Sequence, residues 1–174
     1  IRRASENMVG LVGNLLEFTR TRLGRGISIQ SMAGDMGRIC EEALDVIRSA
    51  HPQQKLVQDV SGELHVNVDA VRMRQVLSNL LDNAVKWSPP AGTIRVQLEG
   101  DRLRVADQGP GIADADLPFV FDRFFRSDTS RNTPGTGLGL SIVAQTVARH
   151  GGWVKAGRSA QGGAEFTVRL PGST

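Results

Sequence analysis

Five polar side chains lie on one face of a long predicted helix, which covers residues 69–87. At about 100° per residue they form a narrow fan opposite the apolar face, and they are Arg72, Gln75, Asn79, Asn83 and Lys86. A polar stripe is most often a solvated helix face. Asparagine is a poor helix former, however, so the repeated asparagines favour a ligand site, because amide oxygens suit Mg²⁺ and the Lys86 ammonium suits phosphate.

Two glycine-rich segments add further candidate chemistry. Residues 107–112, Asp-Gln-Gly-Pro-Gly-Ile, follow a predicted strand, where the glycines admit a planar ligand and Asp107 can accept a hydrogen bond from a ligand amine. An ordinary Asp-Gly-Pro-Gly turn fits the same residues. Residues 135–140, Gly-Thr-Gly-Leu-Gly-Leu, lead into a predicted helix whose N-terminus favours phosphate. Their spacing matches neither the Walker pattern nor the dinucleotide fingerprint.

The elements that must position these residues follow from periodicity. Hairpin signals such as Gly100-Asp101 favour an α+β fold with a mixed, mostly antiparallel sheet, helices on one face and an amphipathic helix in front. The stretch 107–139 is interpreted as a binding loop or lid, because unstructured segments of this length are rarely filler. Helices are predicted at about 1–23, 35–50, 69–87 and 138–150, and strands at 27–32, 55–60, 65–68, 93–99, 102–106, 153–157 and 164–170.

The composition excludes several classes of protein. With 40% hydrophobic and 22% charged residues, the 174-residue chain can build a soluble core and is not expected to be disordered. The net charge of +3, without basic runs interleaved with aromatics, gives no support for nucleic-acid binding. The single cysteine, Cys40, excludes an internal disulfide and is predicted to be a core residue. No apolar stretch approaches the roughly 20 residues that span a bilayer.

The three clusters, in this order, resemble the ATP-binding domain shared by sensor histidine kinases, DNA gyrase, the Hsp90 chaperones and the MutL repair proteins. The resemblance runs from about residue 27 to 170. Residues 79–86 resemble the N box, 107–111 the G1 box and 135–140 the G2 box. The segment Phe-Asp-Arg-Phe-Phe-Arg at 121–126 resembles the F box, which points to the histidine-kinase branch.

The resemblance implies a two-layer α/β sandwich that holds Mg·ATP between the N-box helix and a mobile lid. Residues 14–20 are similar to the second helix of the dimerisation hairpin that precedes the catalytic domain in such kinases. Residues 1–26 are therefore assigned to this hairpin and residues 27–174 to the ATP-binding catalytic domain, with the lid at about 108–136.

The resemblance also assigns roles to single residues. Asp107 is expected to bind the adenine amino group and Asn83 to ligate Mg²⁺. With Asn83, the expected catalytic residues are the cations Lys86, Arg126 and Arg131, which would reach the phosphates. The complete set of expected nucleotide-binding residues is Asn79, Asn83, Lys86, Trp87, Asp107, Gly109, Gly111, Ile112, Gly135, Thr136, Gly137, Leu138 and Gly139.

Three phenylalanines and two departures from the family pattern complete the expected site. Phe121, Phe124 and Phe125 are expected to anchor the lid on the domain body. Trp87 stands where relatives usually have Tyr, Phe or His, and its ring is still expected to pack beside the nucleotide. Ala164 stands where many relatives have Thr, which predicts the loss of a water-mediated link to the adenine-binding carboxylate.

The function implied by the resemblance is that of a two-component protein histidine kinase, which moves the ATP γ-phosphoryl to a histidine for relay to a response-regulator aspartate. None of His51, His65 and His150 stands in the expected His-Glu/Asp context, so the acceptor is expected upstream of Ile1. Expected partners are a second copy of the full-length protein, as a homodimer, and a response-regulator receiver domain. Neither nucleic acid nor a membrane is expected to contact this fragment, and its expected location is cytoplasmic.

Two other functions fit the same fold. One is a nucleotide-binding regulatory protein without kinase activity, either a degenerate kinase or an anti-sigma-like factor. The other is an ATPase of the gyrase or MutL kind, which is disfavoured because those enzymes carry a water-activating glutamate in the N-box helix. Here the ligand-facing stripe has Gln75, Asn79 and Asn83 instead.

Overall fold

The computed structural model describes residues 8, 9, 12, 13, 15, 16, 19, 26–61 and 64–172. The helix predicted over 1–23, and with it the segment 14–20 assigned to the dimerisation hairpin, therefore lies largely outside the described residues. Among the described residues, no helix has the length and apolar character needed to cross a membrane. The same part of the chain holds no cluster of three or more His, Cys, Asp or Glu side chains that could bind a metal ion.

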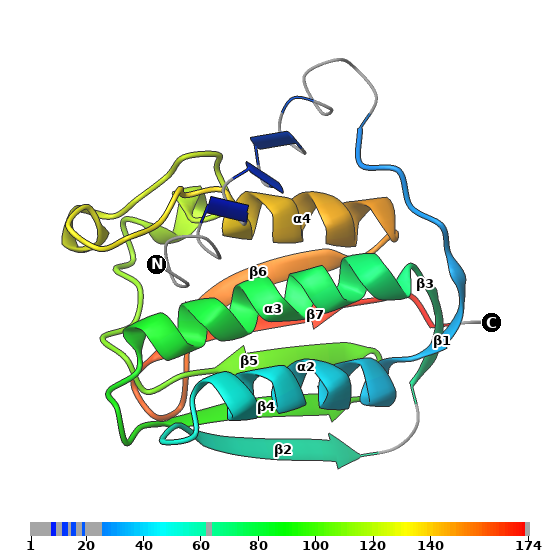
Figure 1. The fold of residues 1–174 in the computed structure, drawn as a ribbon, viewed down its shortest axis with the longest axis horizontal. Coiled ribbons are helices and arrows are strands. Elements are labelled where there is room, and N and C mark those ends of the chain that lie inside the picture. Colours follow the sequence, from blue (N-terminus) through cyan, green and yellow to red (C-terminus); the bar gives the residue numbers. More distant parts are fainter. Residues whose placement is uncertain are drawn as a thin grey trace.

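One five-stranded sheet forms the back layer of the domain (Figure 1). Its strands in spatial order are β2 (Lys55–Ser61), β4 (Thr93–Glu99), β5 (Arg102–Ala106), β7 (Ala164–Arg169) and β6 (Trp153–Arg158). The β2–β4 pair is parallel and the other three pairs are antiparallel. The predicted mixed, mostly antiparallel sheet is confirmed.

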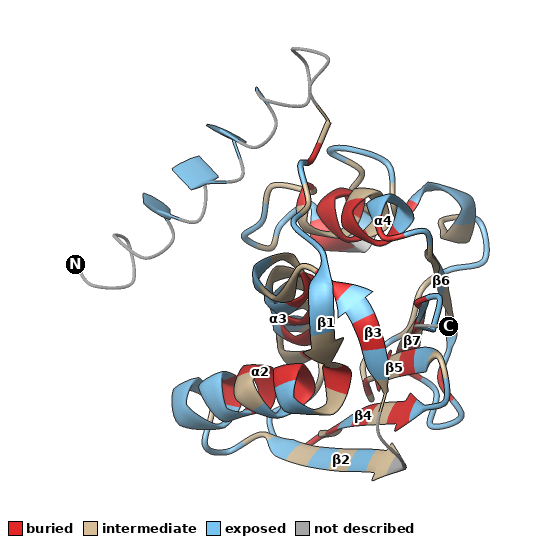
Figure 2. Cartoon of the chain, turned by 90° about the vertical axis from the view of Figure 1, so that its right-hand side faces the viewer, coloured by how far each residue is buried: buried red, intermediate tan, exposed pale blue. Residues whose placement is uncertain are grey.

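Three helices cover one face of this sheet (Figure 1). They are α2 (Met36–Ala50), α3 (Ala70–Trp87) and α4 (Gly139–Arg149), and two short 3-10 turns, η1 (Leu117–Phe119) and η2 (Asp128–Ser130), lie in the predicted lid. Figure 2 shows that the buried residues of these helices gather on the sides that face the interior. The two-layer arrangement follows because every second residue of β4 and β5 is buried against the apolar stripes of the helices.

Side-chain caps explain where helices α2 and α3 begin. The Asp35 carboxylate accepts the N–H of Gly37 at 2.8 Å, and the Asp69 carboxylate accepts the N–H of Arg72 at 3.1 Å. Such caps satisfy backbone donors that the first helical turn leaves unpaired. Cys40 lies fully buried on α2 as predicted, and burial raises the pKa of its thiol to about 12, which makes it unreactive.

The strand predicted at residues 27–32 is wrong, because the strand lies at β1 (Met32–Asp35), paired antiparallel with β3 (His65–Val68). The backbone before β1 bonds to side chains instead of to a neighbouring strand. Arg149 Nε donates to the Ile27 carbonyl at 3.1 Å, and the Gln30 N–H donates to the Asp69 carboxylate at 2.9 Å. Because these groups are already satisfied, the segment needs no strand partner.

The same region joins the ends of two helices. The Asp69 N–H donates to His150 Nε2 at 3.0 Å, and His150 Nδ1 lies 2.7 Å from the Thr146 carbonyl oxygen. His150 is buried, so its two ring nitrogens connect the start of α3 to the end of α4. Residues 26–30, which bond to Arg149 and Asp69, are therefore held at the point where these two helix ends meet.

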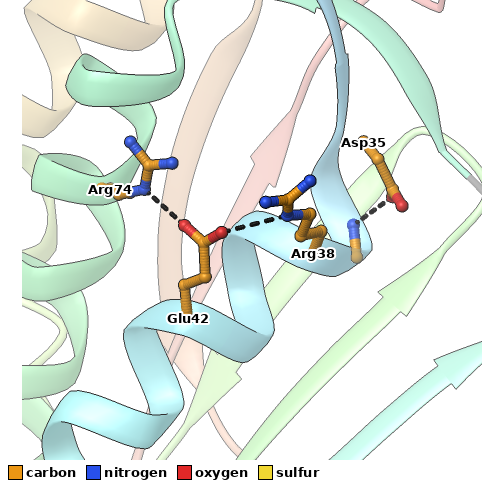
Figure 3. Close-up of polar contacts among 5 residues, drawn as sticks. Asp35, Arg38, Glu42 and Arg74 are labelled. Carbon is orange, nitrogen blue, oxygen red and sulfur yellow. Dashed lines mark hydrogen bonds and ion pairs between the residues drawn. The ribbon is translucent and has the colours of Figure 1, made fainter.

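A surface ion-pair network links α2 to α3 (Figure 3). Glu42 accepts from Arg38 Nε at 3.1 Å through one oxygen and from Arg74 Nε at 2.7 Å through the other. The hydrogen bond from Arg74 is the main cause that lowers the pKa of Glu42. Exposed pairs of this kind contribute little to stability, so the two layers are held mainly by the apolar core.

Thr146 offers a direct test of the core. It is fully buried on α4, and its Oγ1 has no hydrogen-bond partner among the described residues. Thr146→Val replaces this hydroxyl by a methyl group of similar shape and is expected to raise the free energy of unfolding by about 1 kcal/mol. Urea unfolding measures the change. Thr167→Val on the open face of β7 is the control, expected within about 0.5 kcal/mol of the parent. A loss of stability in Thr146→Val would show that the hydroxyl is bonded.

Candidate functional site

The Asp107 carboxylate, directly after β5, is the best defined polar group of the candidate site. It is 4% exposed, and its Oδ1 accepts the N–H groups of Gly109 at 2.8 Å and Ala164 at 3.0 Å. Both hydrogen-bond donors that the described residues offer to this carboxylate reach Oδ1, so Oδ2 is available to a ligand amine. Burial raises the pKa of Asp107 above its ordinary value, and the two backbone hydrogen bonds oppose that rise.

Ala164 contacts Asp107 through its backbone, and the expected loss of a water-mediated link stays a prediction. The alanine side chain cannot replace a threonine hydroxyl, but the Ala164 backbone N–H reaches the carboxylate directly. The Asp107 N–H in turn donates to the Ala164 carbonyl at 2.9 Å. Neighbouring strands β5 and β7 therefore fix the carboxylate without any side chain at position 164.

The glycines of residues 107–112 are required by the protein's own backbone. A Cβ at Gly109 would lie 2.6 Å from the Trp87 carbonyl oxygen, at the end of α3. Gly111 has φ +78°, and a Cβ there would lie 3.2 Å from the Gly162 carbonyl oxygen. Ile112 packs partly buried against the core. Close packing on α3 and on the β6–β7 turn is thus a further reason for glycine at these positions, beside the turn and the ligand approach considered from the sequence.

The polar stripe of α3 faces the start of α4 and the lid. Asn79 Nδ2 donates to the Gly139 carbonyl at 3.3 Å, and Asn83, one turn later, is half-buried. Lys86 Nζ donates to the Pro134 carbonyl at 2.9 Å and lies 5.0 Å from the centroid of the Trp87 ring. Partial burial, with Arg126 nearby, lowers the pKa of Lys86. The stripe is therefore not simply a solvated face, because Asn79 contacts the G2 segment and Lys86 contacts the residue just before it.

Arg126 bonds to the backbone of the predicted lid. Its guanidinium donates to the carbonyls of Gly135 at 3.1 Å, Ser130 and Thr133. The structure thus brings Arg126 and Lys86 to adjacent carbonyls, those of Pro134 and Gly135. Arg131 is arranged differently: its Nη2 lies 3.1 Å from Asp128 Oδ1, and both side chains are largely exposed.

One of the three expected phenylalanine anchors contacts the domain body. The Phe121 ring meets Phe166 of β7 edge-on at 6.2 Å between centroids. Phe125 lies tilted against Phe119, which belongs to the same predicted lid, at 6.1 Å between centroids, so its role as an anchor stays a prediction. The expectation for Phe124 is wrong, because the residue is 55% exposed. Its backbone has φ +61°, and its N–H donates to the Gly137 carbonyl at 2.9 Å, so the main chain rather than the ring holds this part of the lid.

The remaining glycines and Thr136 shape the second half of the lid. Gly137 has φ +72°, and a Cβ there would lie 2.8 Å from the Phe124 carbonyl carbon. Thr136 Oγ1 accepts the N–H of Leu138 at 3.3 Å, just before α4 begins at Gly139. A side chain at Gly135 would lie 3.3 Å from Lys86 Nζ. The expected G2 residues therefore lie together beside the α3 stripe.

Ser159 is a site residue that sequence reasoning missed. Its hydroxyl donates to the Asp107 carbonyl oxygen at 3.1 Å from the turn between β6 and β7. A serine before glycines in a hairpin turn is ordinary turn composition, so the sequence carries no signal for this contact.

Comparisons with known proteins identify the family of the chain. A sequence model of the family described as "Histidine kinase-, DNA gyrase B-, and HSP90-like ATPase" matches residues 68–174. The signal transduction histidine-protein kinase/phosphatase MprB of Mycobacterium sp. (strain KMS) is 39% identical over 176 residues, which cover 96% of this chain and 33% of that protein. The chain thus spans about a third of the length of such relatives.

Solved structures give the same result. A mycobacterial sensor histidine kinase MprB structure is 35% identical with a TM-score of 0.76, covering 81% of this chain and 98% of that one. Full-length ShkA in complex with AMPPNP is 30% identical with a TM-score of 0.81, covering 99% of this chain and 37% of that one. The chain therefore belongs to the histidine kinase-, DNA gyrase B- and HSP90-like ATPase family, as a sensor histidine kinase ATP-binding domain.

Proposed function

We propose that this domain binds Mg·ATP and is the catalytic part of a two-component sensor histidine kinase, transferring the γ-phosphoryl to a histidine outside this sequence. The observation that carries the proposal is the buried Asp107 carboxylate, held through Oδ1 with Oδ2 available to a purine amine. The similar ShkA structure was determined in complex with AMPPNP, which supports a nucleotide as the ligand.

The cations of the site would act on the triphosphate. Lys86 and Arg126 donate to adjacent lid carbonyls, and the phosphate oxygens of ATP would compete for the same N–H groups. Phosphoryl transfer needs little from the protein beyond positioning and charge neutralisation, which these two residues supply. Arg131 would have to leave its exposed pairing with Asp128 to take part.

The amide oxygen of Asn83 is the proposed protein ligand for Mg²⁺. The donor set fits this ion, because a neutral hard oxygen beside phosphate oxygens and waters is a usual magnesium environment. When bound, Mg²⁺ would neutralise part of the triphosphate charge. Asn79 is proposed to face the nucleotide from the same stripe, with its amide nitrogen bonded to the Gly139 carbonyl at the start of α4.

The partners and location follow from the same proposal. The full-length protein would be a homodimer that phosphorylates a histidine and passes the phosphoryl group to an aspartate of a response-regulator receiver domain. A cytoplasmic location is inferred, since ATP and such regulators are found there. The alternative of a nucleotide-binding regulator without kinase activity has no specific observation in its favour.

Calorimetric titration of ATP, with and without Mg²⁺, tests nucleotide binding. Asn83→Ala is expected to bind ATP without Mg²⁺ as the parent does, and to lose about tenfold in the affinity that Mg²⁺ adds. Asn67→Ala, at an exposed position of β3, is the matched control. Full Mg²⁺ enhancement in Asn83→Ala would remove that residue from the metal site.

Phosphoryl transfer needs a longer protein that includes the segment upstream of Ile1. Incubation with γ-labelled ATP is expected to give acid-labile, alkali-stable label on a histidine of that segment. A folded protein that binds Mg·ATP yet forms no such label would favour the regulatory alternative over the kinase.

A further inference from the structure

We propose that Ser159 is a positioning residue for adenine recognition, fixing Asp107 from behind through the turn between β6 and β7. The inference rests on the proposed binding of ATP and deepens it. It concerns residues 159–163, which lie outside the N, G1, F and G2 segments and more than 50 positions from Asp107 in sequence.

The Ser159 hydroxyl uses its whole hydrogen-bonding capacity at this place. Its Oγ donates to the Asp107 carbonyl oxygen at 3.1 Å and accepts the N–H groups of Gly163 at 3.1 Å and Gln161 at 3.3 Å. A hydroxyl has one donor and two acceptor positions, so all three are occupied. Since the side chain is 6% exposed, water cannot easily replace these bonds.

The same serine closes the turn that carries the second donor to the carboxylate. The Ser159 N–H donates to the Gly163 carbonyl at 2.7 Å, and the Gly162 N–H donates to the Ser159 carbonyl at 3.0 Å. Ala164, the next residue, donates its N–H to Asp107 Oδ1. Ser159 therefore holds both the backbone of Asp107 and the chain that orients its carboxylate.

The fit between turn and carboxylate is tight. A Cβ at Gly163 would overlap the carbonyl oxygen and Oδ1 of Asp107 and would lie 2.6 Å from its carbonyl carbon. The turn therefore packs directly against Asp107, and a shift of Gly163 toward β5 would press on it. The hydrogen bond from the Ser159 hydroxyl to the Asp107 carbonyl therefore helps to determine the direction of Asp107 Oδ2.

A second contact ties the outer side of the turn to the G1 segment. Gln108 Nε2 donates to Gln161 Oε1 at 2.9 Å, while Gln108 Oε1 accepts the Thr93 N–H at 2.8 Å. The Gln108–Gln161 bond is exposed, so water can replace it at little cost. It provides an internal comparison for the buried serine.

Titration with two different nucleotides distinguishes a positioning role of Ser159 from a general loss of structure at the site. Purine riboside triphosphate keeps the sugar and triphosphate of ATP but lacks the 6-amino group that Asp107 Oδ2 would accept. The parent is expected to prefer ATP. Ser159→Ala is expected to lower ATP affinity about tenfold and purine riboside triphosphate affinity by less than about twofold, so that the preference collapses. Calorimetric titration of both nucleotides with Mg²⁺ measures this.

Three further variants sharpen the test. Ser159→Cys keeps a weak donor and acceptor and is expected to fall between parent and Ser159→Ala, which gives a readout if the alanine variant does not fold. Gln161→Ala and Ser49→Ala are expected to keep the parent's preference. Ser49 makes a serine-to-carbonyl bond on the remote helix α2.

The outcomes distinguish the two proposals. A parent that binds both nucleotides equally would overturn adenine recognition by Asp107, and with it this inference. A parent that prefers ATP, with serine variants that keep this preference or lose both affinities equally, would overturn the role of Ser159 alone. An equal collapse in Gln161→Ala would assign the effect to the turn as a whole and would also overturn it.

Discussion

Replacing Asp107 by asparagine is expected to lower the affinity for ATP about 100-fold while leaving the fold intact. Asparagine can keep its oxygen where Oδ1 accepts from Gly109 and Ala164. The amide nitrogen must then stand in place of Oδ2, so a donor would face the donor of the adenine amino group. The loss combines a hydrogen bond to a charged group with this repulsion.

Calorimetric titration at fixed Mg²⁺ concentration measures the Asp107→Asn effect, and the thermal unfolding midpoint shows that the fold is kept. Asp45→Asn is the matched control, because this exposed carboxylate on α2 pairs with Arg48 at 2.8 Å and lies outside the site. An Asp107→Asn affinity within about threefold of the parent would show that Oδ2 does not contact the ligand.

Gly163→Ala is expected to lower the free energy of unfolding by about 3 kcal/mol and to abolish ATP binding. The added Cβ would overlap two oxygens of Asp107. One is its backbone carbonyl oxygen, which accepts from the Ser159 hydroxyl, and the other is Oδ1, which accepts from the Ala164 N–H. Neither can give way without breaking the β5–β7 contact at Ala164. Stability and binding should therefore be lost together.

The control for Gly163→Ala is the same substitution at Gly157, on neighbouring β6. A Cβ at Gly157 meets nothing within 4 Å among the described residues, so the variant is expected to stay within about 1 kcal/mol of the parent and to bind ATP normally. Urea unfolding and ATP titration of the pair give the comparison. Equal stability of the two variants would contradict the close approach at Gly163.

Elements fixed by local signals were predictable from the sequence. The hairpin at Gly100-Asp101 joins β4 and β5 at the predicted residues, because alternation and turn composition act over neighbouring positions. The position of β1 was not predictable in this way. Its register depends on β3, some thirty residues later, and on the side chains of Asp69 and Arg149 that hold the preceding backbone.

In the candidate site too, some residues could be predicted from local sequence and others could not. Asn79, Asn83 and the two glycine-rich segments stand out because those residues are unfavourable in regular structure unless something requires them. Ser159 carries no such signal. Its contact with Asp107 exists only because the sheet order places β7 between β5 and β6, which brings the β6–β7 turn beside the end of β5.

The attachment of residues 26–30 has a mechanical consequence. Ile27 is fastened to the end of α4 through Arg149, and Gln30 to the start of α3 through Asp69, so the incoming chain has two separate points of support. The two bonds are made to different helices, so a displacement of residues 26–30 acts on the start of α3 and the end of α4 together. The entering chain is in this way coupled to both helices that flank the candidate site.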